Sequence, residues 1–346
     1  MVMVSPSCCR FRLPGPPHRW YFNVMLVHLC GALALALSAA RGADHNDFNT
    51  WLQELRAEAQ QSGIRETTLS AALDDLKPLP RVIELDRKQP ESTLTYDQYV
   101  KLVVPPSRIS KGRALLNTHR DLLNQIEKQY GVPPHVIVAL WGIESDYGLR
   151  TGGFQTIAAL ATLAHDGRRD SYFRRELLNA LRILDDGHIP ADRMVGSWAG
   201  AMGQSQFMPS SFLNAAVDFN SDGRRDIWGT LGDVFASTAN YLTRAGWHPG
   251  EPWGQRVTLP DDLDRALMGL NVQKSVDAWQ ELGVRDVDGG SLLKHASQQG
   301  AVIVPAEGSD PAFLVFHNFR VFLKWNRSTY FALAVGHLSE QIRQSP

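Results

Sequence analysis

The segment Pro134–Gly148, PHVIVALWGIESDYG, contains the helix on which the rest of the fold depends. It begins with proline, which suits the first turn of a helix because no hydrogen bond is lost there. Ile137, Leu140 and Trp141 share one face of that helix, as core residues do. Three residues after Trp141, the same face carries Glu144 instead of an apolar side chain. The pattern therefore predicts a buried helix that directs one carboxylate toward the core.

Glu144 is the candidate catalytic residue. A carboxyl group that is removed from water resists ionisation, so its pKa rises. A Glu with a raised pKa is suited to general acid catalysis near neutral pH. Two other interpretations remain open from spacing alone: a buried Arg could neutralise the carboxylate, or the frayed helix end could expose it to solvent.

Amphipathic patterns on both sides of this segment predict a mainly α protein, of the α+β class. Further helices are expected at residues 48–59, 68–76, 112–130, 156–164, 171–185, 210–217, 231–245 and 330–342. Residues 81–106 are expected to be irregular, because Pro90, Pro105 and Pro106 limit regular structure.

From Trp253 the pattern changes to short β-prone runs separated by Gly, Asp and Pro, at residues 255–259, 301–304 and 312–316. These runs predict a small β-containing domain inserted into the α body. We therefore divide the chain into a leader at residues 1–40, a catalytic α domain at 41–248, an inserted β-containing domain at 249–317, and a return to the α domain at 318–346.

The leader has the features of an export signal. Its first part contains three arginines and no acidic residue, Val24–Leu37 is apolar apart from one His, and Ser38–Ala40 supplies small residues for cleavage. A single membrane anchor is the alternative, because the apolar stretch could extend back to Tyr21. Val27–Leu29 before Cys30 lacks the small residues that a lipoprotein signal needs. The leader therefore predicts a soluble exported protein, with cleavage near residue 40.

Composition excludes several classes of protein. The chain has 35 basic and 36 acidic residues and is 44% hydrophobic, so it is neither a general nucleic-acid coat nor a disordered chain. All three cysteines lie in the leader. The main body therefore has no disulfide framework, no Cys-ligated zinc and no thiol nucleophile. The motifs of serine hydrolases, zinc proteases, phosphate loops and dinucleotide-binding folds are also absent from the sequence.

Small residues surround one Trp and one Met in the segment Gly196–Gly203. They would let a backbone or a ligand approach closely, and Ser197, Gln204 and Gln206 add hydroxyl and amide groups suited to uncharged polar ligands such as sugars. Tight packing of helices is an equally good interpretation of the same residues.

The acidic loop Asp218–Asp226, DFNSDGRRD, resembles the start of an EF-hand. Side chains with oxygen atoms occupy positions one, three, five and nine, and Gly occupies position six. Position twelve is Gly229 rather than Glu, and the next carboxylate is Asp233. The loop is either a structural calcium site or a turn without metal, since Asp, Asn and Gly are also ordinary turn residues.

Together, these motifs resemble the lytic murein transglycosylases of the B type, glycoside hydrolase family 103. The resemblance runs from about residue 48 to the C-terminus, in motifs that occur in the family's order: Arg87–Glu91, Trp141–Gly148, Ala159–Leu163, Gly196–Gly203, Gln206–Ser211, Asp218–Trp228 and Asn318–Phe319. It implies a lysozyme-like α domain with a small inserted β domain, acting on peptidoglycan glycan strands in the periplasm of a Gram-negative bacterium.

The resemblance also implies a mechanism in which Glu144 is the only catalytic acid. Glu144 protonates the oxygen that joins N-acetylmuramic acid to N-acetylglucosamine, and the muramoyl N-acetyl group assists. Glu144 then acts as a base on the C6 hydroxyl, which gives a 1,6-anhydro product. Substrate assistance removes the need for a second carboxylate and for any cofactor in the chemistry. The alternatives are a lysozyme-type muramidase and a non-catalytic peptidoglycan-binding scaffold for cell-wall synthases.

The family's binding positions can be carried over residue by residue. Its sugar contacts fall on Arg168, Arg169, Ser197, Gln206, Tyr241 and Asn326. Trp325 stands where the family has Tyr, so a stacking face is kept and a hydroxyl is lost. The ligands of a structural calcium ion fall on Asp218, Asn220, Asp222, the Arg224 carbonyl and Asp233, although the spacing from Trp228 to Asp233 is one residue longer than in the family. Cell-wall synthases are the expected protein partners.

Overall fold

The structure is a computed structural model, and it describes residues 48–88, 94–292, 298–305 and 311–344. Prolines begin several of its helices. The chain divides into two units, residues 1–45 and 46–346. The first, with the predicted export signal, lies outside the described residues. Within the described ranges no helix is long and apolar enough to cross a membrane.

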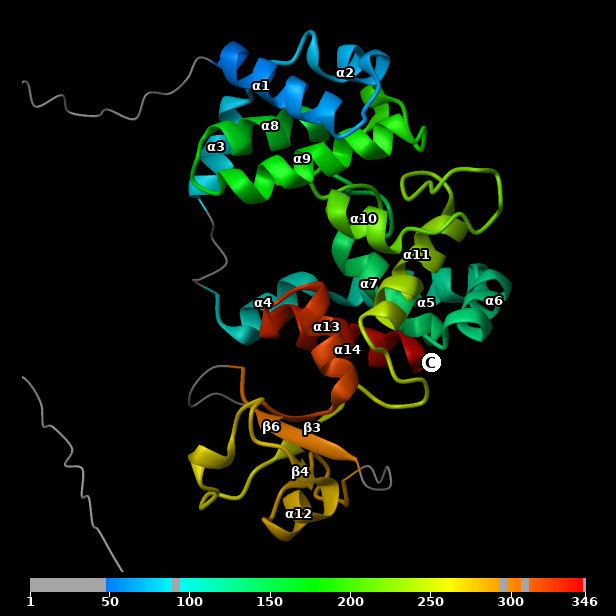
Figure 1. The fold of residues 1–346 in the computed structure, drawn as a ribbon. Helices are drawn as coiled ribbons and strands as arrows, with labels where there is room; N and C mark the ends of the chain where they lie inside the picture. Colours follow the sequence, from blue (N-terminus) through cyan, green and yellow to red (C-terminus); the bar gives the residue numbers. More distant parts are fainter. Residues whose placement is uncertain (1–47, 89–93, 293–297, 306–310, 345–346) are drawn as a thin grey trace, which may run out of the picture. The chain divides into compact units, whose positions relative to one another are not determined.

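One helical group is formed by α1 (Phe48–Gln61), α2 (Glu66–Leu73), α3 (Pro80–Arg87), α8 (Thr156–His165) and α9 (Asp170–Asp185) (Figure 1). Helix α8 is buried along most of its length, which its run of Ala, Leu, Ile and Thr permits. It packs against α9, and α3 packs against α8. Helix α10 (Pro209–Ala215) joins this group through its contacts with α9 and its buried Phe212.

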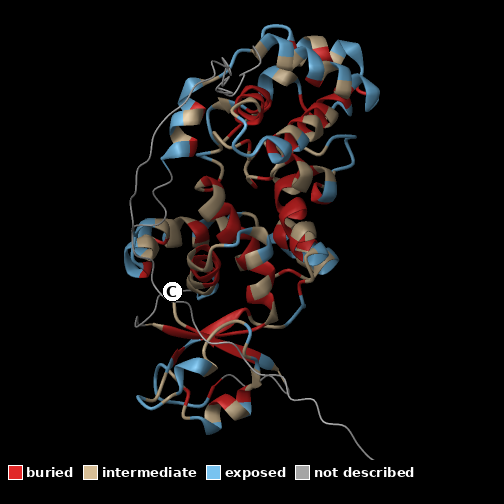
Figure 2. Ribbon diagram, turned by 60° about the vertical axis from the view of Figure 1, so that its left-hand side comes forward, coloured by how far each residue is buried: buried red, intermediate tan, exposed pale blue. Residues whose placement is uncertain are grey.

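A second helical group surrounds α7 (Pro134–Ser145) and contains α4 (Tyr96–Val103), α5 (Pro106–Thr118), α6 (Arg120–Tyr130), α11 (Leu231–Arg244), α13 (His317–Trp325) and α14 (Thr329–Arg343). Helices α5, α6, α11 and α14 all contact α7. Pro134 occupies the first turn of α7, as its sequence predicts, and residues 136–142 are buried. Figure 2 shows the buried residues along the inner faces of the helices.

The third part contains an antiparallel sheet in the order β4-β6-β7-β3-β5. Its strands are β3 (Gly254–Thr258), β4 (Lys274–Ser275), β5 (Arg285–Asp286), β6 (Gln299–Ile303) and β7 (Ala312–Val315), with α12 (Val276–Glu281) after β4. In the central strands Val302 faces Leu314, and Val257 faces Ala312. The mainly α fold with a small β part is therefore confirmed, while the domain limits at 248 and 317 stay a prediction.

Two expectations about local structure were wrong. The described part of residues 81–106 is largely helical, because short helices form there: Pro80 begins α3, and the Thr95–Gln98 capping box begins α4. The helix expected at 112–130 is in fact two helices. Between α5 and α6, His119 has φ −106° and ψ 19°, outside the α-helical range, and it separates the two helices.

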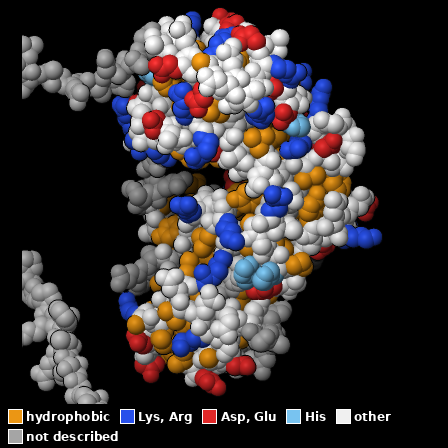
Figure 3. Space-filling model, viewed as in Figure 1, with side chains coloured by type: hydrophobic (Ala, Val, Ile, Leu, Met, Phe, Trp, Pro, Cys, Tyr) orange, Lys and Arg blue, Asp and Glu red, His pale blue; other side chains and the backbone are white. Residues whose placement is uncertain are grey.

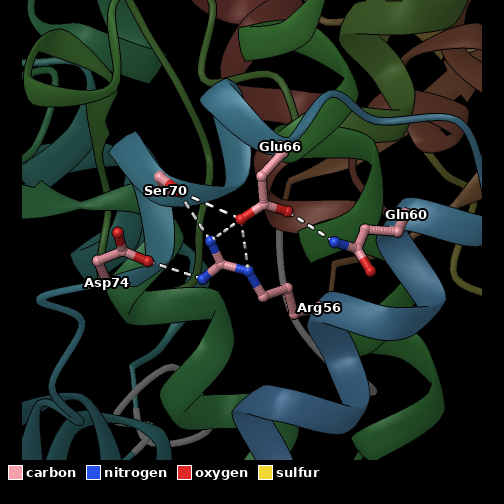
Figure 4. Close-up of polar contacts among 5 residues, drawn as sticks. All are labelled: Arg56, Gln60, Glu66, Ser70 and Asp74. Atoms are coloured by element: carbon pink, nitrogen blue, oxygen red, sulfur yellow. Dashed lines mark hydrogen bonds and ion pairs between the residues drawn. The ribbon is translucent and has the colours of Figure 1, made fainter.

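Arg56 joins helices α1 and α2 through a group of polar contacts (Figure 4). Its guanidinium group donates to the carboxylates of Glu66 and Asp74, the latter at 2.7 Å, and to the Ser70 hydroxyl. Gln60 also donates to Glu66, at 2.6 Å. The hydrogen bond from Arg56 is the largest cause that lowers the pKa of Glu66 below its usual value. The charged form of Glu66 is therefore tied to the folded arrangement of these helices.

We expect Arg56→Ala to lower the melting temperature by a few degrees at pH 7, because a network of ion pairs is lost. The lowered pKa of Glu66 gives stability that is present above its usual pKa and is lost as the pH falls through the folded value. Melts at pH 7 and pH 3 should therefore show a smaller difference from the parent chain at pH 3. Arg81→Ala, which removes one exposed pair with Glu84, is the control and should change little.

Candidate active site

Glu144 lies in the last turn of α7, just before the chain reverses. Asp146 caps the helix with φ 52° and ψ 45°, and Tyr147 and Gly148 also have positive φ. Trp325, the last residue of α13, donates its indole N–H to Oε1 of Glu144 at 2.6 Å. The carboxyl group is thus held between the ends of two helices that are distant in the sequence.

Loss of solvation raises the pKa of Glu144 to about 7, and the hydrogen bond from Trp325 opposes that rise. No Lys or Arg in the described ranges pairs with this carboxylate, so the interpretation as a buried ion pair is not supported. Because an indole N–H can only donate, Oε1 must accept, and Oε2 is left to carry the proton of the neutral acid. This arrangement suits a group that must be both acid and base near neutral pH.

Trp325 is held by an aromatic cluster with Tyr241 and Phe207. Their ring centroids are 4.7 Å apart for Trp325 and Tyr241 and 5.4 Å apart for Trp325 and Phe207. The Tyr241 hydroxyl donates to the backbone carbonyl of Lys324 at 2.8 Å, which joins α11 to the end of α13. The structure therefore brings three of the predicted site residues together: Glu144, Tyr241 and Trp325. Phe207, which completes the cluster, was missed because its ring alone gives no functional signal.

Ser197 lies in the segment Gly196–Gly203 and Gln206 lies three residues after it, and both side chains also bond to backbone. Ser197 accepts from Ala201 N at 3.1 Å, and Gln206, with φ 49°, donates to Thr151 O at 3.0 Å. A Cβ atom on Gly196 would lie 2.1 Å from the Ala201 carbonyl oxygen. Close backbone packing therefore explains this glycine, while the hydroxyl and amide groups remain candidates for ligand contact.

Arg168 and Arg169 form a separate cluster on Asp86. The buried Asp86 carboxylate accepts from Arg168 Nε at 2.8 Å and from Arg169 Nη2 at 2.6 Å. Both arginines are partly exposed, and two guanidinium groups share one carboxylate, so the cluster has a net positive charge. Sequence reasoning missed Asp86, because it lies in the stretch that was expected to be irregular. Asn326 is exposed and accepts from Ser328 N at 3.0 Å.

The acidic loop is folded by its own side chains. Asp218 accepts from the backbone of Asp222 and Gly223, and Asp222 accepts from Arg224 N at 2.9 Å. Burial raises the pKa of Asp233, and the nearby carboxylates of Asp218 and Asp222 raise it further, so the three repel one another. A divalent cation would relieve that repulsion, and oxygen donors suit calcium.

The donor set of the loop therefore fits calcium in its chemistry. In the part of the chain that the structure describes, no three His, Cys, Asp or Glu side chains are placed to hold a metal by themselves. The Asn220 side chain and the Arg224 carbonyl would have to complete the site.

The surface is hollowed between the levels of α9 and α13 (Figures 1 and 3). Arg169 directly precedes α9, and Trp325 ends α13. Two groups of predicted sugar contacts therefore belong to elements on either side of this hollow.

A protein-family model for the transglycosylase SLT domain matches residues 47–340. The chain belongs to the lytic transglycosylase family. This lytic transglycosylase is 30% identical to the membrane-bound lytic murein transglycosylase B of Escherichia coli (strain K12) over 302 residues, which cover 81% of this chain and 79% of that protein. The resemblance to the B-type family is thereby confirmed.

Solved structures agree with the family assignment. SltB3 from Pseudomonas aeruginosa, in complex with NAG-NAM-pentapeptide, is 44% identical with a TM-score of 0.84, over 87% of this transglycosylase and 80% of that chain. Slt35 from Escherichia coli, in complex with calcium, is 29% identical with a TM-score of 0.72, over 84% and 92%. The lysozyme-like α architecture expected for a lytic transglycosylase is confirmed by these neighbours.

Proposed function

We propose that this lytic transglycosylase cleaves the β-1,4 bond between N-acetylmuramic acid and N-acetylglucosamine in peptidoglycan and leaves a 1,6-anhydro end. The observation that carries the proposal is the Glu144 carboxyl group, with a pKa of about 7, held by the donor-only indole of Trp325. A neutral acid and its carboxylate are then both accessible at the working pH.

The reaction proceeds in two steps on one carboxyl group. Glu144 gives the proton on Oε2 to the glycosidic oxygen, and the N-acetyl oxygen of the muramoyl residue bonds to C1 as the glycosidic bond breaks. The Glu144 carboxylate then takes the C6 hydroxyl proton, and O6 displaces the N-acetyl oxygen from C1. Trp325 stabilises the carboxylate between the steps, because hydrogen bonds to charged groups are the stronger ones.

A second carboxylate is not needed at this site. The nearest acidic side chain in the sequence, Asp146, is 3.6 Å from Arg108 and 3.7 Å from Arg150. Its carboxylate is therefore paired with two arginines. Single-acid catalysis with substrate assistance agrees with this arrangement.

The product is supported by a relative. SltB3 from Pseudomonas aeruginosa has also been solved in complex with NAG-anhNAM-pentapeptide, at 44% identity to this chain. We infer that the predicted sugar contacts bind the glycan strand here: Arg168, Arg169, Ser197, Gln206, Tyr241, Trp325 and Asn326.

Digestion of purified sacculi, followed by mass spectrometry of the soluble fragments, tests the proposal. Anhydro-muramoyl ends are expected. Reducing muramic acid ends would instead identify a lysozyme-type hydrolase, and the absence of fragments would leave a binding scaffold. The same digestion with inactive protein separates enzymatic ends from those already present in the sacculi.

We propose that the acidic loop and Asp233 bind a structural calcium ion. Calcium added to metal-stripped protein should raise its melting temperature by a few degrees, because the ion would bind only the folded loop. Asp222→Ala should abolish the rise while leaving the melting temperature of stripped protein nearly unchanged. If calcium does not change the melting temperature of the metal-stripped parent chain, the loop is a turn without metal.

We also propose that the protein is exported to the periplasm and works there with cell-wall synthases. The leader supports export, since it has the charge pattern and the small residues of a cleaved signal. N-terminal sequencing of protein recovered from the periplasm of a Gram-negative host should give a chain that starts near residue 41. A chain that stays in the membrane fraction with an intact leader would favour the anchor instead.

A further inference from the structure

Gln204 connects the segment after the acidic loop with helix α7. Its backbone N–H donates to the carbonyl of Ile227, and its side-chain Nε2 donates to the carbonyl of Trp228, both at 2.8 Å. Its Oε1 accepts from the indole N–H of Trp141, also at 2.8 Å. One residue thereby bonds to two segments that are far apart in the sequence.

At the α7 end, Trp141 cannot reorient independently of its helix. It is 4% exposed, and its ring meets those of Phe235 and Tyr147 edge-on, at centroid distances of 5.0 and 5.4 Å. Glu144 lies three residues later on the same face of the helix. A displacement of the indole is therefore passed to the turn that carries Glu144.

Gln204 also lies against the chain on the other side of Glu144. A Cβ atom on Gly148 would be 2.3 Å from Gln204 Oε1, and Gly148 has a φ of +81°. Both the space, as long as the Gln204 amide stays in place, and the positive φ at this position favour glycine. The Gln204 amide thus contacts the helix before Glu144 and the turn after it.

At the other end, Asp226 fixes the carbonyl that Gln204 binds. Asp226 Oδ1 accepts from the backbone N–H groups of Trp228 and Gly229, each at 2.9 Å. Its own N–H donates to Asp233 Oδ2 at 2.7 Å. The orientation of the Trp228 peptide therefore depends on how the acidic loop is folded.

We propose that Gln204 is a positioning residue that couples the conformation of the acidic loop to the placement of Glu144. Its amide is bonded to protein groups on both sides, so it acts through Trp141 rather than on the reacting atoms. The inference rests on the proposed role of Glu144, and it adds a route by which a distant loop sets the geometry of the acid. A small misplacement of a catalytic group is enough to lower the rate strongly.

A double-mutant cycle tests this coupling. Gln204→Met keeps the volume of the side chain and removes its hydrogen bonds, and Asp226→Ala releases the Trp228 peptide. From initial rates on purified peptidoglycan, Gln204→Met should lower kcat about 10- to 100-fold with little change in KM. Asp226→Ala should lower kcat as well, and adding it to Gln204→Met should cause no further loss. If the double variant loses the product of the two single losses in kcat, or if folded Gln204→Met keeps the parent kcat, the proposal is wrong.

Gln204→Glu is a second variant for the same cycle, because it keeps the acceptor for Trp141 and loses the donation to Trp228. It should uncouple the loop in the same way. Gln280→Met is the matched control: this half-buried Gln in α12 accepts from Leu292 N at 3.2 Å, and its loss should leave kcat unchanged.

A readout that does not depend on activity separates this proposal from the proposed function. The indole N–H signal of Trp141, assigned with Trp141→Phe in a ¹H–¹⁵N spectrum, should move when Asp226 is replaced by Ala. It should stay in place when the same replacement is made in Gln204→Met. If the Trp141 signal does not move when Asp226→Ala is made in the parent chain, the proposed coupling is wrong, whatever the product analysis shows. Hydrolytic products with a signal that moves would overturn the proposed function alone.

Discussion

Glu144→Gln should lower turnover of peptidoglycan at least about a thousandfold, because one group supplies both the acid and the base. The amide cannot give or take a proton at either step, while its size and its contact with the Trp325 indole are kept. Release of soluble fragments from sacculi measures the rate, and co-sedimentation with sacculi should show that binding survives.

Asp146→Asn is the matched control for this variant. It neutralises the neighbouring carboxylate, and Asn tolerates the left-handed backbone at this position. Turnover should stay within about tenfold of the parent, since Asp146 has no proposed part in proton transfer. If Glu144→Gln retained activity and Asp146→Asn lost it, the assignment of the acid would be wrong.

Glu144→Gln should also be more stable than the parent chain in alkaline solution. The folded pKa of Glu144, about 7, is raised above its usual 4.5, so its contribution is fully present below 4.5 and is lost as the pH rises through 7. Above pH 7 the parent therefore carries a poorly solvated charge that Gln avoids, at a cost of at most about 3 kcal/mol. Urea unfolding at pH 5 and pH 8 should show the advantage of Gln mainly at pH 8.

Trp325→Phe should move the alkaline limb of the rate profile to higher pH. The indole N–H bond lowers the pKa of Glu144 against the effect of burial, so its removal raises that pKa further. It also releases the carboxyl group from its fixed orientation, and we expect kcat at neutral pH to fall about tenfold or more. The pH dependence of kcat on soluble glycan fragments measures both effects.

Trp247→Phe is the control for the loss of an indole. Trp247 is buried against Phe322 of α13, and its N–H has no acceptor in the described part of the chain. Its replacement should leave the profile where it is. A shift of equal size in both variants would mean that packing around α13, rather than the bond to Glu144, controls the profile.

Local sequence patterns predicted the elements whose formation depends on near neighbours. The proline and the apolar face of α7 were sufficient to place that helix, and the short β-prone runs placed β3, β6 and β7 but not the two-residue strands β4 and β5. Local patterns failed where a small backbone change decides the outcome. His119 separates α5 from α6, and no residue in that stretch is a strong helix breaker.

The sequence by itself determined a mainly α chain with a small β part and a lone Glu on an apolar face. Only the tertiary structure decided what that Glu meets: the donor is Trp325, 181 residues away. In the same way, Arg168 and Arg169 converge on Asp86, and Gln204 joins Trp141 to the segment after the acidic loop. Helix periodicity reports which face of a segment is buried, because neighbours three and four residues apart share that face. It does not report which distant segment covers the face, and the pKa of Glu144 depends on that covering.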